Sequence, residues 1–238
     1  KRMHRALDEQ GIARGAADYV LAGEADGSPI IGRLVERGLD NELVGTAYAV
    51  VDGIDGRTHH IKLPDMEAAG DSAPGSIVEL RSFDDANGNQ RVALATRSDL
   101  SIEAQTTASG ATWLDRQLVA RDPVDLGGGF GLEVKQAMEA RAAHLIEDGM
   151  ARRDGERILF NRNLIGTLRQ RELDALGDGL AVETGMPFQK ATEGEYVAGT
   201  YSRRFAMASG RFAMIDDGLG FKLVPWTPSI EKHIGQHI

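Results

Sequence analysis

The stretch Leu132–Phe160, LEVKQAMEARAAHLIEDGMARRDGERILF, decides the fold that the sequence predicts. Its first part is typical of an amphipathic helix over residues 132–148, because apolar residues recur every three or four positions on one side. These apolar residues are Val134, Met138, Ala142, Leu145 and Ile146. Gly149 should end the helix, since glycine readily adopts the left-handed conformation that follows a last helical turn. Asp154-Gly155 then predicts a tight hairpin turn, and the whole order predicts a winged-helix-like unit over residues 114–172.

Basic side chains crowd this helix and hairpin. Residues 141–171 contain seven arginines and four acidic residues, although the whole chain has a net charge of −9. Such a helix can lie in the major groove of DNA while arginines on the hairpin meet phosphates. The predicted DNA contacts are Lys135, Arg141, Arg152, Arg153, Arg157, Arg162 and Arg169, with a second group at Arg203, Arg204 and Arg211. Two alternatives stay open: a solvated face of salt bridges, and a winged helix that only connects proteins.

Short apolar runs separated by turn residues flank this centre on both sides. Before it, Asp84–Asn89 is a strong hairpin signal, and the predicted strands are residues 46–51, 58–63, 76–81 and 91–96. After it, the predicted strands are residues 196–201, 205–208, 212–215 and 221–224. Four short strands joined by tight turns favour a small antiparallel barrel or a curled sheet.

The remaining segments are predicted to be helical. Within residues 1–43 we expect helices at Ala6–Gln10 and Ala16–Ala22, and a third that begins at Ser28 and ends at Gly38. The other expected helices are Trp113–Ala120, Leu164–Leu176 and Pro228–Gly235. Leu34–Leu39 also resembles Leu145–Met150, which suggests a repeated unit of helix, glycine stop and hairpin.

Together these patterns predict an α+β fold in which small β-barrel modules flank a winged-helix-like helical centre. We expect three domains: a helical segment with a small barrel over residues 1–99, the winged-helix-like domain over residues 100–180, and a C-terminal small barrel over residues 181–238.

Composition excludes several classes of protein. The chain has 238 residues and no cysteine, which removes disulfides and thiolate metal sites and fits the cytoplasm. No apolar run approaches the roughly 20 residues of a membrane span, so we expect no membrane insertion. No signal peptide is apparent, and an opening at Lys1 rather than Met suggests a fragment of a longer protein. The net charge of −9 argues against binding to DNA by electrostatic attraction alone.

No catalytic centre, metal site or cofactor is expected. His59 and His60 are adjacent on a predicted strand, so their rings should point to opposite faces, whereas the metal-binding pair of rolling-circle nucleases needs His-hydrophobic-His. The glycine run 127–131 lacks the Gly-Lys-Ser/Thr ending of a phosphate loop, which favours a linker. Tyr201 lies close to Arg203-Arg204, but a strand-cleaving tyrosine needs a nearby metal.

Trp226 is the most unusual single residue. It follows the strand 221–224 and is held between Pro225 and Pro228. We predict a structural plug at the end of a barrel, with a partner-binding or base-stacking role as the alternative.

Four stretches together resemble an uncharacterised domain in the C-terminal part of bacterial conjugative relaxases, which are similar to T-DNA border endonucleases and plasmid mobilisation nucleases. They are YAVVDG (48–53) with GRTHH (56–60), GATWLDR (110–116), SGRFA (209–213), and LVPW (223–226) followed by Pro228 and Glu231. The resemblance runs from about residue 5 to the end of the chain. In that family a separate nuclease domain nicks one strand at the transfer origin, and its motifs are absent here.

The resemblance implies a non-catalytic accessory region that binds transfer-origin DNA, single- or double-stranded. Relaxosome or secretion coupling proteins are further partners that it implies. The alternative is a protein-interaction or type IV secretion recognition module without DNA binding.

Overall fold

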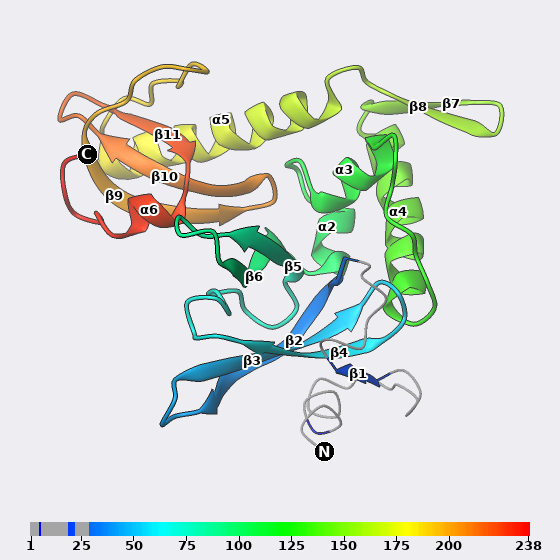
Figure 1. Ribbon diagram of the computed structural model, residues 1–238. Coiled ribbons are helices and arrows are strands. Elements are labelled where there is room, and N and C mark those ends of the chain that lie inside the picture. The colour runs from blue at the N-terminus through cyan, green and yellow to red at the C-terminus, as the bar shows by residue number, and fades with distance from the viewer. Residues whose placement is uncertain (1–4, 6–18, 22–28) are drawn as a thin grey trace.

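The computed structural model describes residue 5, residues 19–21 and residues 29–238. Its largest element is a six-stranded sheet in the order β1-β4-β3-β2-β5-β6, in which β1 pairs in parallel with β4 and every other pairing is antiparallel. The strands are β1 (Tyr19–Leu21), β2 (Ile31–Asn41), β3 (Thr46–Gly53), β4 (Thr58–Leu63), β5 (Ile77–Asp84) and β6 (Gln90–Ser98). This sheet occupies the lower part of Figure 1.

The rest of the described chain forms helices, a hairpin and a second sheet. The helices are α2 (Ile102–Thr106), α3 (Trp113–Val119), α4 (Phe130–Glu147), α5 (Leu164–Thr184) and α6 (Pro228–Glu231). Strands β7 (Ala151–Asp154) and β8 (Arg157–Phe160) form the hairpin, and β9 (Thr200–Met207), β10 (Gly210–Asp216) and β11 (Phe221–Pro225) form an antiparallel sheet in the order β11-β10-β9. Helix α5 runs from the hairpin to this second sheet (Figure 1).

The expected fold class is wrong in its two main features. The described sheets are open and none closes into a barrel, and no separate helical centre lies between two β modules. The reason is that the helices bury their apolar faces against the sheets. Phe130 and Val134 of α4 pack with Ile31 and Ile77 of the large sheet. Leu173 and Leu180 of α5 pack instead with the C-terminal sheet, against Phe212, Met214, Phe221 and Leu223.

The same clusters cross the expected domain boundaries at residues 99/100 and 180/181. The boundaries themselves stay predictions.

The predicted helix from Ser28 to Gly38 is also wrong, because Ile31 to Gly38 lie in strand β2, while Ser28 lies outside the described residues. There Ile31 pairs with Glu79 of β5 and Leu34 pairs with Val51 of β3, so β2 is hydrogen-bonded on both sides. Pairing with two neighbouring strands satisfies the backbone hydrogen bonds as well as a helix does. It also buries the side chain of Leu34 completely. Gly38 lies inside the strand, against Tyr48, and the suggested repeat is lost because Leu34–Leu39 is strand while Leu145 lies on α4.

The expected helix Ala6–Gln10 lies outside the described residues, and of the expected helix Ala16–Ala22 only the part Tyr19–Leu21 is described, as a strand. The sequence missed α2. The other expected elements are present, some with large shifts of their ends: α5 extends to Thr184 instead of Leu176, and α6 ends at Glu231 instead of Gly235. Strand β4 matches its predicted bounds, α4 begins two residues before the predicted start, and the two strands expected at residues 196–208 are one strand, β9.

Candidate functional site

The β7–β8 hairpin projects from the body of the protein beyond the ends of α4 and α5 (Figure 1). Its strands pair Arg152 with Leu159 and Arg153 with Ile158. Because side chains alternate along a strand, cross-strand partners share a face. Ala151, Arg153, Ile158 and Phe160 therefore share one face, and its apolar members pack against α4 and α5 residues of the protein core. Arg152, Asp154, Arg157 and Leu159 share the other face, where all four are exposed.

The arginines of this hairpin have no carboxylate partner among the described residues. Arg152, Arg153 and Arg157 are exposed, and no ion pair joins any of them to the part of the chain that the structure describes. Arg162, in the turn before α5, is exposed and unpaired in the same sense. We use the name arginine hairpin for these four residues, of which the first three lie on the hairpin and Arg162 follows it directly. Arginine that is not neutralised internally can meet phosphate oxygens with its fork of N–H donors.

Arg141, by contrast, cannot belong to a DNA surface because its side chain is completely buried. Its Nε and Nη2 donate to the two oxygens of Asp115 at 2.8 and 2.9 Å. Nη1 and Nη2 donate to the carbonyls of Ala108 and Gly110. Asp115 also caps α3 by accepting from the backbone N–H and the hydroxyl of Thr112. The structure thus makes Arg141 a clamp that joins α4 to α3.

The second predicted group of arginines is also neutralised internally. Arg203 pairs with Glu183 at 2.9 Å, and Arg204 pairs with Asp71 at 2.9 Å. Arg211 donates two hydrogen bonds to Asp99 and one to Asp71. Of the other predicted residues, Arg169 lies over the ring of Phe212 and Lys135 is exposed on α4.

Arg211 and Trp226 form the centre of a junction between the two large sheets. The backbone N–H of Trp226 donates to the carbonyl of Arg211, and the guanidinium groups of Arg204 and Arg211 lie 4.9 and 5.3 Å from the indole centre. Asp71 and Asp99 belong to the region of the large sheet, so their ion pairs with Arg211 tie it to β10 of the C-terminal sheet. Trp226 does not plug a barrel, because the described sheets are open, and its half-buried ring lines a groove.

Carboxylates in this junction are held in their charged form. The pKa of Glu231 is lowered because the hydroxyl of Tyr201 and the indole N–H of Trp226 both donate to it, at 2.8 and 2.6 Å. Burial would raise the pKa of Asp71, but hydrogen bonds from Arg211 and Arg204 outweigh that effect and lower it. Burial, and then the bond to Glu231, raise the pKa of Tyr201 to about 12.

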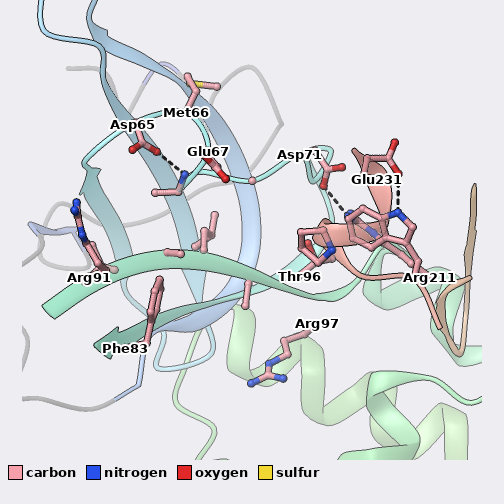
Figure 2. A pocket seen from close by; sticks show the side chains of 18 of the residues that line it. Asp65, Met66, Glu67, Asp71, Phe83, Arg91, Thr96, Arg97, Arg211 and Glu231 are labelled. Atoms are coloured by element: carbon pink, nitrogen blue, oxygen red, sulfur yellow. Dashed lines mark hydrogen bonds and ion pairs between the residues drawn. The ribbon is translucent and has the colours of Figure 1, made fainter. Parts of the chain in front are cut away.

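An open groove of about 1080 Å³ extends from this junction along β6. Figure 2 shows Met66 and Glu67 on one side of it, Phe83 and Arg91 at one end, and Arg211 with Glu231 at the other. Ala93, Leu94 and Ala95 of β6 also line it. Strand β6 is an edge of the large sheet, and on its outer side the backbone N–H of Leu94 donates to the carbonyl of Ala68. The groove lining combines apolar side chains with charged ones.

Some of the charged side chains that line the groove form ion pairs, and others do not. Arg91 pairs with Asp85, Arg97 pairs with Glu79, and Arg211 is neutralised as described. Asp65 and Glu67 line the opposite wall and form no ion pair with any described residue. The charge available at that wall is therefore negative, whereas Lys232, directly after α6, is a lining cation that forms no ion pair with any described residue.

Sequence reasoning missed the groove and most of the junction. Neither Phe83 nor Asp71 was assigned to an element, because the predicted strands are residues 58–63, 76–81 and 91–96. One signal was available for Arg141: it follows Met138 by three positions and precedes Leu145 by four, which places it on the apolar side of the helix. Two of the resembling stretches do meet in space, since the backbone N–H of Ala111 donates to the hydroxyl of Ser209 at 2.9 Å.

The residues weighed for catalysis are occupied by structural contacts. His59 is buried against Asp55 at 2.9 Å, while His60 stacks on Tyr48, so the two rings point apart. A side chain at Gly127 or Gly131 would collide with the carbonyl of Asp55 or Ile54, which makes the glycine run a close contact with the β3–β4 turn. Tyr201 is fully buried. Within the described residues no group of three His, Asp or Glu could hold a metal ion.

Comparison with protein families assigns the chain to one family. It belongs to a family described as "Protein of unknown function (DUF3363)", whose model matches residues 1–86 and 81–238. No curated protein and no solved structure was found to be similar to it. Among the described helices, none is both long enough and apolar enough to cross a membrane.

Proposed function

We propose that this chain is a non-catalytic, DNA-binding accessory region of a conjugative relaxase, acting in plasmid or T-DNA-like transfer. The observation that carries the proposal is the arginine hairpin. Its cations lie on or directly after a projecting element and form no ion pair with any described carboxylate, whereas Arg141, Arg203, Arg204 and Arg211 each pair with one. The resemblance to relaxase accessory domains supplies the biological setting. We place the protein in the cytoplasm for that reason, with transfer-origin DNA and relaxosome or coupling proteins as partners.

The hairpin arginines should account for much of the salt dependence of DNA binding. Replacing Arg152, Arg153 and Arg157 with alanine should weaken binding to all sequences alike and flatten the slope of log K against log[salt] by about 2. Fluorescence anisotropy with labelled duplex and single-stranded DNA across a salt series measures both quantities.

The matched control is the triple change of Arg203, Arg204 and Arg169 to alanine, which removes the same charge from paired or ring-stacked positions. This control should leave the slope near that of the parent. A hairpin variant that stays folded and keeps the parent's slope would contradict the proposal.

A second candidate function, recognition of a partner protein, is favoured by the groove. Its wall combines apolar side chains such as Met66 and Phe83 with the unpaired carboxylates of Asp65 and Glu67. Apolar pockets with a few charged groups are typical of ligand sites. We propose an apolar segment carrying a basic residue as the occupant, contributed by a partner protein that binds without DNA.

The groove should accept a neutral apolar probe. Nile red should fluoresce more strongly with the parent than with Ala95→Gln, because the longer polar side chain enters the groove. Val182→Ser, which changes an apolar residue of α5 that is 87% exposed and does not line the groove, is the control and should behave like the parent. Equal fluorescence of the parent and Ala95→Gln would show that the groove does not take the probe.

A further inference from the structure

The register of the β7–β8 hairpin divides its arginines between two faces. Arg152 and Arg157 lie on the outward face, with Leu159 as the cross-strand partner of Arg152. Arg153 lies on the inward face, beside the apolar residues that attach the hairpin to the core. Arg153 is exposed as well, but the apolar residues of its face pack against the core, so the outward face is the one on which all four strand side chains are exposed.

The outward face combines charge with an exposed apolar side chain. Leu159 is 38% exposed, although its neighbours Ile158 and Phe160 pack against the core. Leu159 lies opposite Arg152 and two positions from Arg157 on the same face, and neither arginine forms an ion pair with a described residue. Such a face matches a duplex surface, where arginines meet the phosphates and an apolar side chain contacts sugars and base edges. Asp154, opposite Arg157, is the one acidic residue among the strand positions of this face, and no ion pair joins the two.

From this arrangement we infer that the hairpin binds duplex DNA through its outward face alone: Arg152 and Arg157 contact phosphates, Leu159 packs against the DNA between them, and Asp154 opposes binding. The inference rests on the proposed function and adds to it the form of the nucleic acid and the residues that touch it. A single strand lacks two backbones at a fixed spacing, so duplex should be bound more tightly than a single strand of the same sequence.

Single substitutions separate these roles, because charge and apolar contact respond differently to salt. Arg152→Ala and Arg157→Ala should each flatten the log-log salt slope by about 0.9, the amount expected for one phosphate contact. Arg153→Ala, which removes the same charge from the other face, should leave the slope unchanged. Leu159→Ala should keep the parent's slope but weaken binding by about three- to tenfold at every salt concentration.

Asp154→Asn provides a test by gain of affinity. Removing its charge takes a repulsive carboxylate away from the phosphates, so binding to duplex should tighten by about two- to fivefold at low salt, with a smaller gain at high salt. Because Asp154 is exposed and forms no ion pair with a described residue, the substitution should leave the melting temperature of the protein unchanged.

The experiment is anisotropy titration of a labelled duplex and its single strand with the full chain and these five variants, each checked by circular dichroism. A slope that falls with Arg153→Ala but not with Arg152→Ala or Arg157→Ala overturns the inference and leaves DNA binding by the hairpin standing. Tighter binding to the single strand overturns it too. A parent chain that binds neither form contradicts the proposed function and this inference together.

Discussion

Replacing Arg141 with alanine should lower the free energy of unfolding by about 3 to 5 kcal/mol, the range seen when one partner of a buried ion pair is removed. The reason is that Asp115 would stay buried with its charge uncompensated, since the two side chains are both fully enclosed. The carbonyls of Ala108 and Gly110 would also lose the donors that Arg141 supplies. Urea unfolding followed by circular dichroism measures the change.

The effect should depend on Asp115. In the double variant Arg141→Ala/Asp115→Ala the loss should be smaller than the sum of the two single losses, because no unpaired charge remains. Lys135→Ala, on the exposed side of the same helix, is the control and should change stability by less than about 0.5 kcal/mol. An Arg141→Ala variant that unfolds within about 1 kcal/mol of the parent would show that the clamp does not stabilise the fold.

Replacing Trp226 with alanine should cost about 2 to 4 kcal/mol. The indole packs beside the cluster of Tyr201, Ala213 and Ile215, and its N–H donates to Glu231. Because the ring also forms part of the groove wall and is only half-buried, the loss should be smaller than for a fully enclosed tryptophan. Thermal melting of the parent and the variant gives the difference.

Trp226→Phe separates the ring from its N–H. It keeps an aromatic ring under Arg204 and Arg211 but removes the hydrogen bond to Glu231, so we expect a loss of about 1 to 2 kcal/mol. A Trp226→Ala variant that melts like the parent would mean that the indole does not stabilise the junction, and its role would then have to be in binding.

Local structure could be predicted where a short stretch settles its own conformation. The strand Thr58–Leu63, the turn at residues 84–89 and the helix stop at Gly149 are all present, because alternation, turn residues and a glycine with positive φ act over a few neighbouring positions. The strand β2 could not be predicted in this way. Its apolar spacing also fits a helix, and only pairing with β3 and β5 decides between the two.

The candidate site shows the same division. The sequence by itself determined that the chain carries a basic hairpin around Asp154-Gly155. Which arginines remain available was decided only by the tertiary structure, because the carboxylates that neutralise Arg211 lie 112 and 140 residues away along the chain. Ion pairing and shared cores depend on distances in space, and these are set by how sheets and helices bury their apolar faces against one another.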